Sequence, residues 1–428
     1  MSTQQLRLPI PESTAPERSV VARFGGRVSH RTGFWMVAYA FAVLMAFSAV
    51  PTPLYVLYAR RDHFSSLTST LIYAAYALGV IGSLFLLGHV SDWVGRRRVL
   101  LPAIVASMAS GVIFIVWQSV PSLVIARILS GVAVGMVTGT ATAHLGELHA
   151  RHRPDRSPRR AQLVAVAANL GGIGLGPLVS GLLAQYAGHP LLVPYLVFEG
   201  LLLAGVAAVA LAPETAALPP EPVAYRPQRI AVPREVRGQF AAAAIGGLVT
   251  FAVLGLFTSL APAFLAGTLH DSSHAVAGAV AFGVFAAAAT AQIALLRLGV
   301  RSTLAVGIAL LPIGLGVLSA ATWFADLPAF VVGGIVTGAG AGLVFKGVLA
   351  TSMGLAPHHA RAEVLAGLFL ASYIGLSVPI VILGIAGQYV STRAETAVFA
   401  AAVTLAVLAT ATKLLARRPG APAVRAEG

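Results

Sequence analysis

The chain has 428 residues, of which 57% are hydrophobic and only 10% are charged. A soluble globular protein is excluded, because such proteins contain about 45–50% apolar and about 25% charged residues. The net charge of +14 comes mainly from Arg residues scattered between long uncharged runs, and this dispersal argues against a nucleic-acid-binding protein.

Twelve stretches are long enough to cross a bilayer, which takes about 20 apolar residues. Charged residues mark their ends, because a charge at the bilayer centre costs at least about 2.5 kcal/mol. The spans expected in the first half are 33–58, 67–88, 99–119, 122–147, 161–185 and 191–211, and those in the second half are 239–264, 275–296, 302–322, 328–352, 364–386 and 396–415. The sequence therefore predicts an all-α integral membrane protein with 12 transmembrane helices.

The distribution of Lys and Arg predicts the orientation of these helices. With the N-terminus inside, 24 basic residues lie on the inner side, while only Arg60, Arg61 and Arg393 lie outside. Short cytoplasmic loops retain positive charge, so both termini are expected in the cytoplasm. We expect a disordered cytoplasmic tail at 1–32, which lacks the apolar core of a signal peptide. The bundles at 33–211 and 239–415 are joined by a cytoplasmic loop at 212–238, and 416–428 form the C-terminal tail.

The two halves resemble each other. Gly176-Pro177 and Val378-Pro379 are 202 residues apart, and Gly95 and Gly299 are 204 apart. These similar offsets indicate a duplicated six-helix unit. Such pseudo-repeat architectures typically bind a solute near the midplane between the halves, so the sequence predicts a transporter.

The loop after the second span reads Gly88-His-Val-Ser-Asp92-Trp-Val-Gly95-Arg96-Arg97-Arg98. It resembles the loop signature of the major facilitator superfamily, Gly-x-Leu-x-Asp-Arg-x-Gly-Arg-Arg, with departures at Val90 and Trp93. The glycines permit a tight turn, and Asp92 suits the positive end of a helix dipole.

The resemblance implies two contacts for this loop. Asp92 would meet the eleventh helix near Ala362, and a loop Arg would pair with an acid at the inner end of the fourth helix, where Glu147 lies. Together these residues would form a gate latch. As an alternative, Arg96, Arg97 and Arg98 serve only as cytoplasmic charge anchors.

The fourth span contains Arg127-Ile-Leu-Ser130-Gly131-Val-Ala-Val-Gly135. This stretch resembles the superfamily's second signature, Arg-x-x-Gln-Gly-x-x-x-Gly, with Ser130 in place of Gln. A lone Arg in a span needs water, a carboxylate or backbone carbonyls. Arg127 is therefore a candidate for proton coupling, with outward snorkelling or carbonyl binding as the alternative.

The fifth span reads Asn169-Leu-Gly171-Gly172-Ile-Gly174-Leu-Gly176-Pro177-Leu-Val-Ser180-Gly181. It resembles the antiporter signature Gly-x-x-x-Gly-Pro-x-x-Gly-Gly, through Gly172, Gly176, Pro177 and Gly181. Small residues allow helix backbones to touch, and Pro bends a helix, which suits a moving interface. The resemblance favours an exporter, and generic helix packing is the alternative.

Together the motifs identify residues 33–415 as similar to the major facilitator superfamily, nearest its 12-helix drug:proton antiporters. The second half carries only a degraded loop signature, Arg297-Leu-Gly299-Val-Arg301, without its Asp. The resemblance implies two rocking bundles and a monomer.

Two further ionisable residues lie inside spans. Glu199 is a candidate for proton coupling, although packing on the sixth helix is equally consistent with its position. Lys346 on the tenth helix is a candidate to bind an anionic substrate or to move a proton, with snorkelling as the alternative. His144 lies one turn before Glu147 and is expected to be an interfacial residue.

A mainly aromatic group occupies helices that line the central cavity in the superfamily. An aromatic cavity with few polar groups suits bulky amphipathic solutes. The group comprises Tyr39, Phe47, Tyr73, Tyr76, Asn169, Phe251, Phe257, Gln292 and Tyr373.

These observations predict a secondary transporter that exports an organic solute in exchange for protons across the inner membrane of a bacterium. The alternative is a proton-coupled importer of a metabolite or sugar, because Pro213-Glu214-Thr215 resembles part of a sugar-porter signature. A membrane enzyme or a sensor is a remote alternative. No cofactor, metal or nucleic acid is expected, since the sequence has no Cys, no metal-binding His spacing and no phosphate-binding loop.

Overall fold

The computed structural model describes residues 28–216, 225–230, 232–259, 262, 265, 267, 273–355 and 361–416. The first half contains α1 (His30–Ala49), η2 (Thr52–Leu54), α2 (Tyr55–Asp62), α3 (Ser66–Leu87), α4 (Ser91–Val94), α5 (Arg96–Val116), α6 (Val120–His152), α7 (Arg159–Val166), η3 (Ala167–Gly171), α8 (Gly172–Tyr186) and α9 (Val193–Leu211). The second half contains η4 (Arg234–Val236), α10 (Arg237–Ser259), α12 (His274–Ala294), α13 (Val300–Phe324), α14 (Leu327–Leu355), α15 (Arg361–Ala386) and α16 (Thr392–Leu415). Twelve of the described helical stretches have the length and apolar character of membrane spans, which confirms the predicted fold class.

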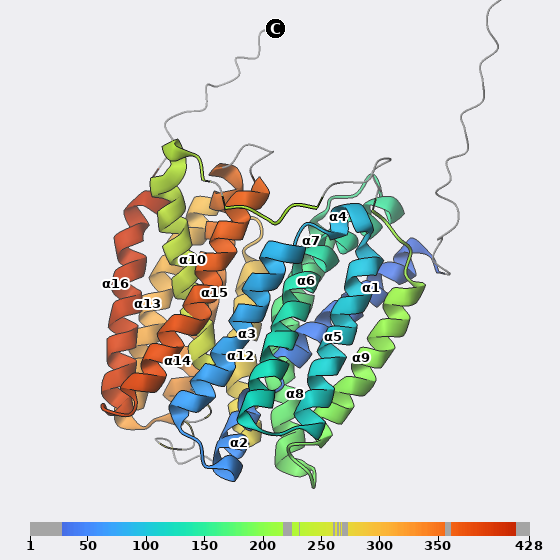
Figure 1. The fold of residues 1–428 in the computed structure, drawn as a ribbon. Coiled ribbons are helices and arrows are strands. Elements are labelled where there is room, and N and C mark those ends of the chain that lie inside the picture. The colour runs from blue at the N-terminus through green and yellow to red at the C-terminus, as the bar shows by residue number, and fades with distance from the viewer. Residues whose placement is uncertain are drawn as a thin grey trace, which may run out of the picture.

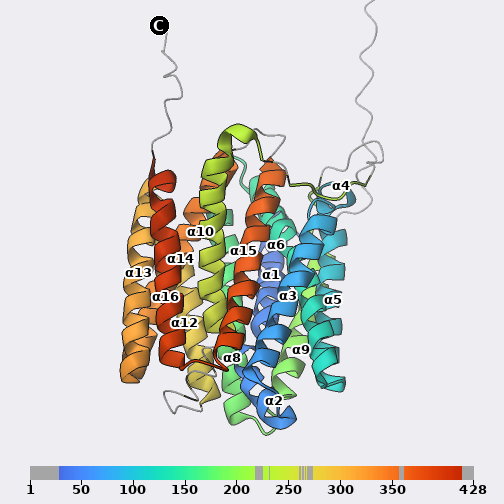
Figure 2. The ribbon, with the colours of Figure 1, turned by 60° about the vertical axis from the view of Figure 1, so that its left-hand side comes forward.

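The helices form two bundles that lie side by side (Figures 1 and 2). The main contacts between the bundles are made by two helix pairs, α3 with α15 and α8 with α12. The segments rich in Arg, including the loop between α6 and α7, lie at the upper end of the molecule in Figure 1. We call this end the basic end and the other the distal end.

The first span is interrupted, where the sequence predicted one helix over 33–58. Helix α1 stops at Ala49, a 3₁₀ turn follows, and α2 continues to Asp62. Pro51 and Pro53 explain the break, because Pro lacks the N–H of a helical hydrogen bond and its ring collides with the preceding turn. At this break, the Ser48 carbonyl accepts a hydrogen bond from the side chain of Arg127.

Serine residues set the starts of several spans. The side chains of Ser29, Ser65, Ser273 and Ser391 accept backbone hydrogen bonds at the first turns of α1, α3, α12 and α16. Such caps satisfy N–H groups that have no partner within a helix. At these four spans, the polar residue that precedes the apolar stretch in the sequence is therefore also the N-cap of the helix.

The two halves are tied together at the distal end. The Tyr73 hydroxyl of α3 lies 2.6 Å from the Thr258 hydroxyl of α10, and the His274 N–H of α12 donates to Gln185 of α8. Among the described residues, these are the hydrogen bonds that join helices of different halves. At the basic end, residues 225–230 cross between the bundles along α3, where Gln228 and Tyr225 donate to the carbonyls of Phe85 and Leu86.

Candidate functional site

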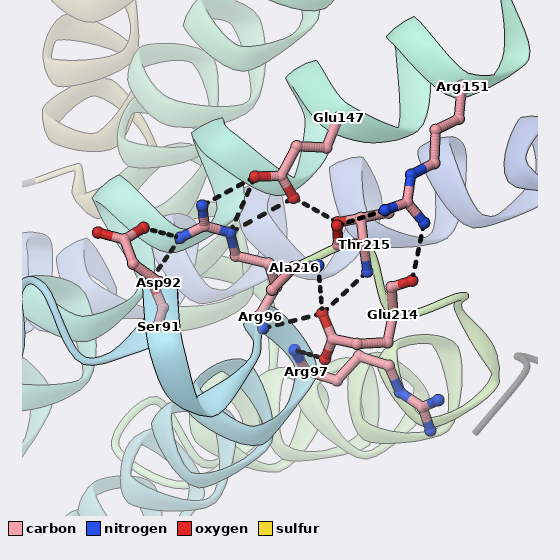
Figure 3. Close-up of polar contacts among 9 residues, drawn as sticks. All are labelled: Ser91, Asp92, Arg96, Arg97, Glu147, Arg151, Glu214, Thr215 and Ala216. Atoms are coloured by element: carbon pink, nitrogen blue, oxygen red, sulfur yellow. Dashed lines mark hydrogen bonds and ion pairs between the residues drawn. The ribbon is translucent and has the colours of Figure 1, made fainter. Parts of the chain in front are cut away.

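A polar cluster occupies the basic end of the first half (Figure 3). We define this gating cluster as Ser91, Asp92, Arg96, Arg97, Glu147, Arg151, Glu214 and Thr215. Its residues come from α4, α5, the end of α6 and the segment that follows α9. Gly95 connects α4 to α5 with a φ of 116°, a left-handed conformation that L side chains adopt only with strain. This turn directs the first residues of α5 into the cluster.

Arg96 is the centre of the cluster, with 9% of its surface exposed. Its Nη2 lies 2.8 Å from Glu147 Oε1, and its Nη1 lies 2.5 Å from Asp92 Oδ1. Nη1 also donates to the Ser91 hydroxyl at 2.7 Å. The structure thus brings together Arg96 and Glu147, as the resemblance implied. The Arg96 guanidinium therefore links α4, through Asp92, to α6, through Glu147.

Glu214 caps the N-terminus of α5. Its Oε1 accepts the N–H groups of Arg96, Thr215 and Ala216 at 2.9–3.1 Å, and its Oε2 accepts that of Arg97 at 3.0 Å. Burial acts to raise the pKa of Glu214, but the backbone hydrogen bonds outweigh it and hold the pKa below its ordinary value. A carboxylate at a helix N-terminus also interacts favourably with the helix dipole.

The segment after α9 is held by α6 as well. His144 Nε2 lies 2.9 Å from the Pro213 carbonyl, and Arg151 Nη2 donates to the Thr215 carbonyl at 2.6 Å. The Thr215 hydroxyl donates to Glu147, so this segment and Arg96 share one carboxylate. We call residues 212–216 the exit segment.

Asp92 lies at the exposed edge of the gating cluster. It pairs with Arg96 within its own loop, and 65% of its side chain is exposed. The expected partner, the start of α15 near Ala362, includes side chains outside the described part of the chain. The contact implied by the resemblance therefore stays a prediction.

Two other loop residues have local roles. Arg97 donates to the Ala210 carbonyl at the end of α9. Gly88 terminates α3, where its N–H donates to the Leu84 carbonyl. Arg97 therefore reinforces the contact between α5 and α9 and is more than a surface charge anchor.

Arg127 is buried near the distal end of the first half, with 3% of its surface exposed. Its Nη1 donates to the Ser48 carbonyl at 2.7 Å, and its guanidinium lies over the rings of Tyr76 and Tyr73, at 4.4 and 5.6 Å from their centroids. The sequence left outward snorkelling or carbonyl binding as alternatives to a coupling role, and the structure shows that Arg127 points inward and binds a carbonyl. Because Tyr73 contacts Thr258, this cation lies beside the tie between the halves.

The glycines of α8 make backbone contacts with two neighbours. A Cβ at Gly172 or Gly176 would lie 2.6 or 2.0 Å from carbonyl oxygens of α1, and a Cβ at Gly181 would lie 2.3 Å from the His274 carbonyl of α12. On the facing helix, Gly278 is equally close to the Pro177 carbonyl. The stretch is thus a close packing surface that joins α8 to α1 at Gly172 and Gly176 and to α12 of the second half at Gly181.

Just before this stretch, residues 167–171 form one turn of π-helix, η3. A π turn leaves the backbone less tightly bonded and often marks a functional position. Asn169 lies in this turn, which packs against both α1 and α12. Asn169 is therefore at the boundary between the halves.

Lys346 contacts the backbone at the end of α12. Its Nζ donates to the carbonyls of Gln292 and Leu295, each at 3.0 Å, and so caps the C-terminus of α12. A cation is favourable there because the helix dipole is negative at that end. Both oxygens belong to the backbone, so the buried Gln292 enters this contact through its main chain.

Glu199 lies within the first half. Its Oε1 occupies the space that a side chain at Gly111 of α5 would fill, close to Phe47 of α1. This oxygen is buried and has no hydrogen-bond partner among the described residues. Its position fits packing between α5 and α9 better than a place between the halves.

The proposed cavity group does not gather in one place. Tyr39 donates to the Leu201 carbonyl of α9, Phe47 lies beside Gly111, and Phe257 packs on Gly334 within the second half. These three therefore do not belong to a surface between the halves. Tyr373 and Phe251 do form a cluster with Phe345 and Phe369, with adjacent ring centroids 5.1–6.2 Å apart.

Sequence reasoning missed the roles of Glu214, Thr215 and Arg151. Two signals were present: the Pro213-Glu214-Thr215 string, and the spacing of Glu147 and Arg151 by one helical turn. Neither signal indicates that a carboxylate would bind the N–H groups of a distant helix.

The sequence matches the model of the Major Facilitator Superfamily over residues 35–295. The chain belongs to this superfamily. It is therefore a multi-pass membrane protein and a secondary transporter of a small-molecule substrate, and its family is not one of enzymes.

Solved structures show the same fold. The human organic anion transporter MFSD10 (TETRAN) superposes with a TM-score of 0.66 at 15% identity, covering 90% of this chain and 99% of that one. The nucleoside transporter NupG gives a TM-score of 0.68 at 13% identity, covering 89% and 99%. No curated protein sequence matches this chain.

Proposed function

We propose that the protein exports an organic solute in exchange for protons and belongs with the drug:proton antiporters of the superfamily. The observation that carries this proposal is the backbone-close packing of the α8 glycines on α1 and α12, in the stretch that resembles the antiporter signature. The packing supports the proposal because the residues that carry the resemblance are the ones whose backbones approach α1 and α12.

The buried Arg127 is the proposed coupling residue. It is a cation inside the membrane, bound to one carbonyl and two aromatic rings, with Nε unpartnered among the described residues. An intramembrane cation of this kind acts on the protonation of a neighbouring or bound group through its field. We place the solute near Arg127, Tyr76 and the aromatic cluster around Tyr373.

The proposal further includes a monomer in a bacterial inner membrane, with both termini in the cytoplasm. The basic end would face the cytoplasm, because 24 of the 29 basic residues lie on that predicted side. The energy source would be the proton gradient.

Transport by purified protein in proteoliposomes tests the proposal. An imposed pH gradient is combined with cationic dyes, antibiotics, organic anions and nucleosides, and solute and proton fluxes are measured together. Solute movement against the proton flow, lost in Arg127→Gln and retained in the exposed Arg393→Gln, is the expected result. Movement in the same direction as the protons would contradict export.

An importer is the second candidate, and one contact favours it. The Pro213-Glu214-Thr215 string, which resembles part of the sugar-porter signature, is in the gating cluster and bonds Glu147 and α5. Co-movement of a sugar or metabolite with protons in the same assay would select this function.

A further inference from the structure

A second charged site lies at the basic end, separate from the gating cluster. It is a pocket between the ends of α1, α6 and α7. Its lining consists of Arg31, Phe34, Trp35, Leu148, His149, His152, Arg153 and Arg160. Neither the transport function nor any of the superfamily motifs in this sequence uses these residues.

The polar side of the pocket is strongly cationic. It contains three Arg and two His, and none of the eight lining residues is acidic. Within the described part of the chain, no ion pair involves Arg31, Arg153 or Arg160. Like charges gathered without a counter-charge repel each other, so the pocket gains stability when an anion enters it.

The other side of the pocket is apolar and lies near the first turns of α1. Trp35 is 49% exposed and lies about 7 Å along α1 from its first residue, at the helical rise of about 1.5 Å per residue. Trp is enriched at membrane–water interfaces, where its ring contacts both headgroups and acyl chains. The ring of Phe34 lies edge-on to Trp35, at 5.3 Å between centroids.

The geometry joins these two sides into one surface. The Arg160 guanidinium lies over the Trp35 ring, 5.6 Å from its centroid, so a positive charge is held at the edge of the apolar wall. His149 is fixed by contacts with the Ser157 carbonyl and the Phe34 ring. The pocket is therefore partly preformed.

We propose that this pocket binds the phosphate headgroup of an anionic phospholipid, whose acyl chains run along Trp35. Arg binds phosphate oxygens through paired N–H groups, and basic pockets between membrane helices suit anionic headgroups. A free phosphate ion would use the Arg residues alone. The exposed Trp35 wall favours the lipid, because only an amphiphile contacts both sides.

Native mass spectrometry of the purified full chain, titrated with phosphatidylglycerol or phosphatidylcholine, tests this proposal. The expected result is preferential retention of phosphatidylglycerol, with an apparent Kd raised about tenfold in Arg153→Gln/Arg160→Gln. The matched control is Arg297→Gln/Arg301→Gln, which removes two exposed cations from the basic end of the second half and is expected to change the Kd less than twofold. An equal loss in both double variants would overturn the proposal, because general surface charge would then explain binding.

Two further measurements distinguish a lipid site from a phosphate site and test the role of Trp35. Millimolar inorganic phosphate is expected to leave the bound lipid in place, whereas displacement would show that the pocket is a site for free phosphate. Trp35→Leu keeps every charge and is expected to weaken phosphatidylglycerol binding about threefold. If the double Arg variant fails to fold, wild type still decides the matter, since equal retention of both lipids would refute the site.

Discussion

Glu214 shows how one side chain can organise three helix ends. It binds the first N–H groups of α5, while its own segment is held by His144 and Arg151 of α6. The Gly95 turn permits this approach, because a Cβ there would lie 2.9 Å from Glu214 Oε2. The carboxylate therefore replaces the capping residue that α5 lacks in its own sequence.

Replacing Glu214 tests this role. Glu214→Gln removes the charge and turns one acceptor into a donor that faces N–H groups, so we expect a loss of about 2 kcal/mol in the free energy of unfolding. Thermal unfolding in detergent measures the change. The exposed Glu235→Gln is the matched control, and equal melting temperatures for the two variants would contradict the capping role.

The pH dependence of stability gives a separate prediction. Because the pKa of Glu214 is lowered in the folded protein, its stabilisation is complete above the ordinary glutamate value of about 4.3. It is lost as the pH falls through the lower folded value. Melting temperatures of wild type and Glu214→Gln should therefore differ fully at pH 7 and converge below about pH 4. A constant difference down to pH 3 would show that another property of Glu214 is responsible.

Lys346 is predicted to stabilise α12 and not to bind substrate. Lys346→Met should lower the free energy of unfolding by about 1 kcal/mol, because two carbonyls lose a charged donor. The substrate KM should stay within twofold of wild type. Lys413→Met, at an exposed position of α16, is the control. A large rise in KM with unchanged stability would restore the substrate-binding interpretation.

At the scale of the elements, helix α8 packs closely against α1 within the first half and against α12 of the second half. A Cβ at Gly176 would lie 2.0 Å from the Ala46 carbonyl, so Gly176→Ala must push α8 from α1. We expect a loss of about 1–3 kcal/mol in stability and a strong loss of transport. Gly139→Ala on α6, where a Cβ meets nothing within 4 Å, should have little effect in either assay.

The helices could be predicted from sequence, because charged residues are largely excluded from the bilayer interior and therefore lie at nearly every helix boundary. The first span was the exception, since Pro51 and Pro53 broke it without any charge. The Arg96–Glu147 pair was also accessible, through the loop signature. Glu214 was not, because binding to backbone N–H groups requires no particular residue type in the partner. The contacts of Lys346 could not be predicted, because its partners are backbone carbonyls, which every sequence contains.

At the scale of the whole molecule, the halves differ more than their repeat suggests. The first half fixes its basic end with acids and Arg, whereas the second has Arg297 and Arg301 without an Asp in its loop. In its place, Lys346 joins α14 to the end of α12. The two halves therefore hold their basic ends by different side-chain chemistry.

The hydrogen bonds that join the halves at the distal end, Tyr73 with Thr258 and His274 with Gln185, predict how the halves move. Spin labels at Val116 and Phe324 report on the distal end, and labels at Gln162 and Arg301 report on the basic end. Because the chain contains no Cys, these sites can be labelled without background substitutions. Adding the transported solute should lengthen the first distance and shorten the second. Changes of the same sign in both pairs would exclude rocking about a central site.

The exit segment has a mechanical consequence. It contacts α1 at Gly33, α5 through Glu214 and α6 through His144, so the end of the sixth span holds three others of its bundle. A force from the second half then acts on the first as a torque on a single stiff body. In the proposed transport cycle, the first half therefore rotates as one unit, and its separate helices bend little.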